Sequence, residues 1–168
     1  MPISSSDILF YLSGGSGNTD PNACTGGVIS TTQITDNTLH NLFNLVTGAQ
    51  ALAGYIDYRG IYIKNNHGSL TLNTPISVWL AQNTADNEIY IGLDPAGVNA
   101  TMATIADINT APAGVTFTQP ATSGAGLSVA QIPSGQSFGL WVKRSVPSST
   151  SAINAAQFQI EIQGDTSA

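Results

Sequence analysis

Charged residues are scarce in this chain of 168 amino acids. Lysine and arginine together number 4 and aspartate and glutamate 10, so charged residues make up 8% of the chain, against about 25% in an average soluble domain. Four basic residues are too few to neutralise the row of phosphates that a nucleic-acid duplex presents. We therefore expect no nucleic-acid partner.

Long apolar runs are missing as well. The run at residues 8–12, near the start of the chain, is far shorter than the roughly 20 residues of a membrane-spanning helix. The same region lacks the basic n-region of a secretory signal peptide. We expect neither a membrane partner nor secretion.

Residues with useful catalytic chemistry are few. Cys24 is the single cysteine, which excludes a disulfide within the chain, and its neighbourhood lacks the basic residues of a reactive thiol. His40 and His67 are the only histidines, and one cysteine with two distant histidines does not make a zinc ligand set. The glycine motifs of phosphate-binding loops and of serine hydrolases are also absent. We expect no enzyme and no cofactor.

Calcium is the metal that the sequence excludes least easily, because oxygen ligands suit it. Asp86, Asp94 and Asp107 lie in or near turn-like segments. Their spacing does not match a calcium-binding loop, and aspartate in turns usually accepts hydrogen bonds from the backbone. We expect no functional metal.

What the chain does contain is neutral polar surface and short apolar runs. Serine, threonine, asparagine and glutamine number 57, about a third of the residues. Short alternating runs, such as 55–65, 136–146 and 157–163, are separated by Gly, Pro, Asn and Asp. This pattern predicts an all-β protein, an antiparallel β-sandwich of about eight strands. Immunoglobulin-like and jelly-roll topologies both stay open.

Two further elements are expected. Leu39, Leu42, Phe43 and Val46 are spaced as one face of a helix, which predicts one short helix within residues 36–46. Residues 1–27 are expected to form an extended N-terminal arm, and residues 28–168 a single β-sandwich domain, because the glycine- and serine-rich stretch 13–18 gives freedom without burial.

Candidate contact residues follow from side-chain alternation. Ile8, Phe10 and Leu12 lie on one side of the arm, a pattern suited to adding a strand to the sheet edge of a neighbouring protein. Exposed aromatic rings anchor partners or stack on sugars, whereas covered rings indicate a sheet packed on both faces. Both interpretations stay open for three aromatic residues that lie opposite the aliphatic face of their strands: Trp79, Tyr90 and Trp141.

Several segments carry a resemblance that runs in order along nearly the whole chain. They are LSGGSGNTDPNA (12–23), GGVIS (26–30), NLFNLVTG (41–48), YRGIYIKN (58–65), IGLDPAG (91–97) and LWVKR (140–144). In these segments the chain resembles a group of structural proteins from the virions of tailed bacteriophages. The motifs are structural rather than catalytic, so the resemblance implies kinship and assigns no functional residues.

The resemblance implies a non-enzymatic virion protein. Our leading hypothesis is a capsid decoration (cement) protein, a homo-oligomer such as a trimer. It would bind other virion proteins, chiefly the major capsid protein on the outer capsid surface, and stabilise the shell through many modest contacts. It would be synthesised in the host cytoplasm. The alternatives are a neck or tail component, including a receptor-contacting tail domain, and a carbohydrate-binding β-sandwich module.

Overall fold

A computed structural model describes residues 2–83, 88–151 and 156–166. Within these residues the chain forms nine strands, one α-helix and three 3₁₀ turns. The strands are β1 (Ile8–Leu12), β2 (Gly26–Gly27), β3 (Tyr55–Asn65), β4 (Asn73–Asn83), β5 (Ile89–Val98), β6 (Met102–Thr104), β7 (Leu127–Val129), β8 (Ser137–Val146) and β9 (Phe158–Asp165). The helix is α1 (Gly48–Ala53), and the turns are η1 (Ser5–Asp7), η2 (Pro21–Ala23) and η3 (Ser123–Ala125).

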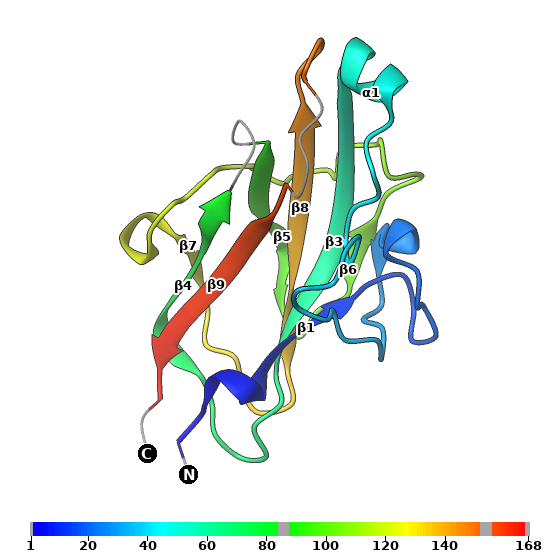
Figure 1. The fold of residues 1–168 in the computed structure, drawn as a ribbon. Helices are drawn as coiled ribbons and strands as arrows, with labels where there is room; N and C mark the ends of the chain where they lie inside the picture. Colours follow the sequence, from blue (N-terminus) through cyan, green and yellow to red (C-terminus); the bar gives the residue numbers. More distant parts are fainter. Residues whose placement is uncertain (1, 84–87, 152–155, 167–168) are drawn as a thin grey trace.

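Two antiparallel sheets pack against each other, which confirms the predicted all-β sandwich. One sheet has four strands in the order β1-β3-β8-β5, and the other has three in the order β7-β4-β9. Figure 1 shows the three-stranded sheet in front of the four-stranded one. A third, two-stranded sheet of β2 and β6 is hydrogen-bonded separately from both, and its Met102 packs against the four-stranded sheet. The register of β3 against β8 runs unbroken from Tyr55 opposite Val146 to Lys64 opposite Ser137.

The main core lies between the two larger sheets. Ile61 and Ile63 of β3, Leu140 of β8, and Val78 and Leu80 of β4 belong to one cluster of buried side chains. These residues alternate along their strands with residues that face away from the core, as expected for strands with a period of two. The face of β3 that carries Ile61 and Ile63 is therefore its core face.

The opposite face of the four-stranded sheet is also covered. Tyr58, Tyr62, Met102 and Trp141 form a second buried cluster, against which Val115, Phe117 and other apolar side chains pack. Three glycines of the sheet, Gly60, Gly92 and Gly139, let this outer layer approach closely. A Cβ atom on Gly92 would lie 2.6 Å from the carbonyl oxygen of Thr116, and one on Gly139 would collide with Met102.

The N-terminal segment does not form a free arm, which corrects the sequence-based expectation. β1 pairs antiparallel with β3 of its own chain, from Ile8 opposite Asn65 to Leu12 opposite Ile61. Its other edge is bonded to residues 30–34, since Leu12 N donates to Thr32 O and Ile34 N donates to Phe10 O. Both edges of β1 are thus used within the chain, so this strand has little backbone left to offer a neighbour.

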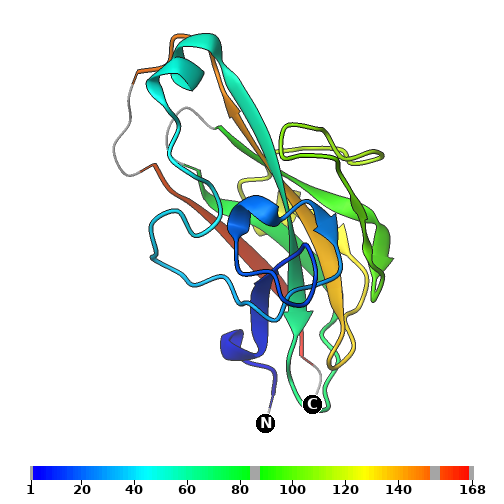
Figure 2. The ribbon, with the colours of Figure 1, turned by 90° about the vertical axis from the view of Figure 1, so that its right-hand side faces the viewer.

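The single helix lies beyond the predicted stretch 36–46. In that stretch Asn37 and His40 adopt left-handed backbone conformations, with φ of 55° and 58°, which an α-helix does not tolerate. α1 begins after Thr47, whose side chain accepts a hydrogen bond from the backbone N–H of Gln50, while the side-chain oxygen of Gln50 accepts one from the backbone N–H of Thr47. This capping box selects residues 48–53 for the helix. The loop that leads to α1 runs along the side seen in Figure 2.

Candidate functional site

The described residues contain no group of three or more histidine, cysteine, aspartate or glutamate side chains that could hold a metal ion. Cys24 is buried, and burial raises the pKa of its thiol. Among the described helices none is long and apolar enough to cross a membrane.

Two of the three aspartates considered as calcium ligands, Asp94 and Asp107, accept hydrogen bonds from backbone N–H groups or from a neighbouring ring. Asp94 is buried, accepts a hydrogen bond from the Trp141 indole Nε1 at 2.8 Å, and accepts another from the backbone N–H of Ala96. Asp107 accepts from the backbone N–H of Asn109 at 2.9 Å. Asp86, the third candidate, lies outside the described residues. The first two carboxylates therefore have structural partners.

A surface hollow of about 470 Å³ is lined by Asp7, His67, Ser4 and neighbouring residues. The hydrogen bonds from the Ser4 backbone and hydroxyl lower the pKa of Asp7. The Nδ1 atom of His67 accepts from the backbone N–H groups of Ser69 and Leu70, at 3.2 and 3.0 Å. Asp7 thus caps η1, and His67 closes the turn after β3, so neither arrangement resembles a general base acting on a nucleophile.

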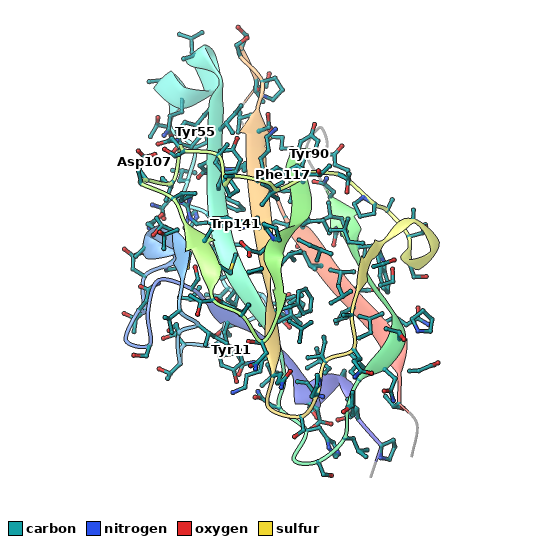
Figure 3. All side chains as sticks on the ribbon, turned by 180° about the vertical axis from the view of Figure 1, so that it is seen from behind. Tyr11, Tyr55, Tyr90, Asp107, Phe117 and Trp141 are labelled. Carbon is teal, nitrogen blue, oxygen red and sulfur yellow. The ribbon has the colours of Figure 1, made fainter. Side chains whose placement is uncertain are left out.

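The three candidate aromatic residues do not share a surface. Trp141 is fully buried, so it cannot contact a partner, and the expectation that it might is corrected: the outer layer covers its ring. Tyr90 is half-buried on the same side of the four-stranded sheet, and the ammonium group of Lys143 lies 4.8 Å from its ring centroid. Figure 3 shows this side of the four-stranded sheet, with Tyr90 and Trp141 labelled. Trp79 is half-buried on β4, in the other sheet. No single aromatic platform for a sugar results.

The candidate residues of the N-terminal segment are also split. Leu12 belongs to the main core and is 2% exposed, which removes it as a contact residue. Ile8 and Phe10 are half-buried and pack at the margin of the same core. These two side chains are thus only partly covered by their own chain.

A segment that sequence reasoning missed exposes several large apolar side chains and carries almost no charge. Every large apolar side chain that is exposed among the described residues falls between positions 28 and 56: Val28, Leu39, Leu45, Leu52 and Ile56. We call residues 28–56 the neutral segment, because Asp36 is its only acidic residue and it contains no lysine or arginine. Leu39 and Leu45 are 81% and 74% exposed, although the helical pattern had placed Leu39 on a buried face.

A buried charge cluster anchors the middle of this segment. The guanidinium group of Arg144 donates two hydrogen bonds of 2.9 Å to the carboxylate of Asp57 and a third, of 2.7 Å, to the backbone oxygen of Asn44. Arg59 lies 3.3 Å from the same carboxylate. The ring of Phe43 packs against both guanidinium groups, at 5.1 and 4.7 Å from its centroid. The loop is therefore fixed at residues 43 and 44, next to the exposed Leu45.

Two positive charges share one negative charge in this cluster. Arg59 is fully buried, and burial lowers the pKa of its guanidinium group. Its Nη1 and Nη2 atoms donate to Tyr58 O and to Asn22 Oδ1, while its Nε has no hydrogen-bond partner. Desolvation makes such a cluster costly, and losing one partner costs more than the pair contributes. Asp57 therefore holds both arginines in place.

Comparisons of the chain with protein-family models, with curated protein sequences and with solved structures gave no match.

Proposed function

We propose that this protein is a non-enzymatic structural component of a bacteriophage virion, a capsid decoration protein that binds the outer capsid surface and stabilises the shell. The observation that carries the proposal is the neutral segment. Five exposed large apolar side chains within one stretch of 29 positions, 28–56, accompany a single carboxylate. Depletion of charge and exposure of apolar side chains characterise the core of a protein–protein interface.

The rest of the structure fits a role in assembly. The loop that presents Leu45 is held by Arg144 and by Phe43, whose contacts with the sheet are buried. A contact loop that is already ordered loses little conformational entropy on binding. Many copies of a modest contact, repeated over a shell, would then give stable attachment. The sequence resemblance to virion structural proteins points in the same direction.

The proposal predicts that Leu45 and Leu52 contact the shell. The double substitution Leu45→Ser with Leu52→Ser should lower the affinity for purified capsids that lack this protein by about tenfold or more, since two apolar contacts are lost. It should leave the folding intact, because the two side chains are 74% and 71% exposed. Ala121→Ser, at an exposed position outside the neutral segment, is the matched control. Equal binding of both variants would refute this contact surface.

The copy number per particle separates the capsid role from a neck or tail role. Quantified gels of purified virions should give a copy number comparable with that of the shell subunits. A copy number equal to one ring of subunits would instead assign the protein to the neck or tail. Absence from virions would overturn the proposal as a whole.

A further inference from the structure

The outer edge of β9 is open. β9 pairs with β4 on one side only, and no hydrogen bond joins the backbone of its other side to any described residue. The edges of the four-stranded sheet are closed by comparison, because β1 is bonded to residues 30–34, and Ile91 of β5 exchanges two hydrogen bonds with Thr118. A strand edge with free N–H and C=O groups is a template for another strand.

The core side of β9 is incompletely covered as well. On β4 the core residues Ile76, Val78 and Leu80 are at most 3% exposed. On β9 the corresponding residues Phe158, Ile160 and Ile162 are half-buried, although they face the same core. Figure 1 shows β9 at the front of the molecule, with β4 beside it. A strand placed beside β9 would satisfy the free backbone groups and cover these three side chains.

The sequence of β9 indicates which strand would pair with its open edge. Residues 157–163 read Gln-Phe-Gln-Ile-Glu-Ile-Gln, which is nearly a palindrome of polar and apolar residues about Ile160. Two copies related by a two-fold axis pair antiparallel, and in such a pair each residue meets its mirror position. We infer that β9 pairs with β9 of a second copy, so that the two three-stranded sheets join into one sheet of six strands.

The register follows from the side chains. With the axis at Ile160, Phe158 faces Ile162 of the second copy and Ile160 faces its own equivalent, so apolar meets apolar. On the other face Gln159 meets Glu161 of the second copy. Within one chain the Gln159 amide already donates to the Glu161 carboxylate at 3.0 Å, and in the pair it can donate to the carboxylate of either copy. An axis at Glu161 would place two carboxylates directly opposite each other, which is unfavourable. The register about Ile160 avoids that repulsion.

This inference concerns the isolated protein and stands apart from the proposed function. A two-fold contact gives a dimer, whereas the trimer suggested by the decoration-protein hypothesis would require a different surface. Because self-association is measured without capsids, its failure would leave the capsid role untouched, and the reverse also holds.

A charge substitution at Gln159 tests the inference, since this side chain is exposed and its replacement leaves the core unchanged. Sedimentation velocity of the purified full chain over a concentration series should show a monomer–dimer equilibrium. Gln159→Lys places an ammonium group opposite Glu161 twice in each dimer and should tighten association by about 2- to 30-fold. Gln159→Glu places two carboxylates opposite each other and should weaken association by a similar factor.

Two controls make the outcome specific. Gln82→Lys and Gln82→Glu make the same charge changes on β4, at the position opposite Gln159 within the sheet, and should shift the equilibrium little. Gln163→Lys tests the register, because with the axis at Ile160 it faces Gln157 and should not tighten the dimer.

Any of three results from sedimentation would overturn the inference. The protein could be a monomer at all concentrations, the substitutions at positions 159 and 82 could change the association constant equally, or the association constant could be unaffected by substitution at position 159. Binding of a different extended peptide by a strictly monomeric protein would also overturn it.

Discussion

The two sheets of the sandwich differ in how completely the chain covers them. The four-stranded sheet has a buried cluster on each face, and both of its edge strands make backbone hydrogen bonds to flanking segments. The three-stranded sheet shares one core face with it, and its other face carries exposed Gln159 and Gln163 and half-buried Trp79. The comparison shows that the chain covers the four-stranded sheet with its own residues. The three-stranded sheet keeps backbone groups and side chains available to neighbouring molecules.

The two tryptophans give the largest expected contrast. Trp141 is fully buried and bonded to buried Asp94, so Trp141→Ala should lower the free energy of unfolding by about 3–5 kcal/mol. Trp79→Ala removes a half-buried ring from the three-stranded sheet and should cost less than half as much. Urea unfolding followed by circular dichroism measures both, and equal losses would break the comparison.

Asp57 tests the charged end of the four-stranded sheet. Asp57→Asn leaves the guanidinium groups of Arg59 and Arg144 buried without their counter-charge, which should cost about 3 kcal/mol. Asp165→Asn, at an exposed position on β9, is the matched control and should change stability by at most about 0.5 kcal/mol. The same unfolding experiment applies. A stability for Asp57→Asn that matches the control would mean that the cluster does not hold the two arginines.

The outer layer lies so close to the four-stranded sheet that adding a methyl group at Gly92 should lower the free energy of unfolding, by less than the two substitutions above. Gly92→Ala places a methyl group against Thr116 and Val115, and such overpacking should cost about 1–3 kcal/mol. Gly124→Ala adds the same group in open space and should be close to neutral. Thermal unfolding of both variants distinguishes them, and equal melting temperatures would show that the outer layer yields without strain.

Alkaline pH should weaken the outer layer by the smallest amount. Burial raises the pKa of the Tyr58 and Tyr62 phenols above the ordinary value near 10. The unfolded chain therefore releases these protons at lower pH than the folded chain does, so stability is complete below about pH 10 and falls as the pH rises through the folded-state pKa values. Urea unfolding on both sides of about pH 10 should show this loss, and Tyr62→Phe should reduce it. A flat profile would contradict the assignment.

Much of this architecture could be predicted from the sequence, because alternation reports burial directly. The alternation over residues 55–65 and 157–163 located β3 and most of β9, and the side chains of β9 that alternation turns inward, Phe158, Ile160 and Ile162, pack against the main core. A covered second face was one of two interpretations that the sequence left open, but the segment that covers it was not predicted. It consists largely of irregular loops around residues 105–118, and loops carry no periodic signal.

The candidate site was harder to predict for the same reason. Helical spacing suggested one apolar face at residues 39–46, but a buried contact between Phe43 and two distant arginines overrode it. A signal was present in the capping box at Thr47 and Gln50, which marked the true helix start. Whether β1 would pair with its own chain or with a neighbour depended on its partner β3, which local sequence does not specify.

The most direct test of the difference between the two sheets is amide hydrogen exchange as a function of protein concentration. Our account predicts that β9 exchanges faster than β1 in dilute solution and gains protection as the concentration rises, while β1 stays equally protected throughout. Protection of β9 that equals that of β1 at every concentration, or that never changes with concentration, would contradict it.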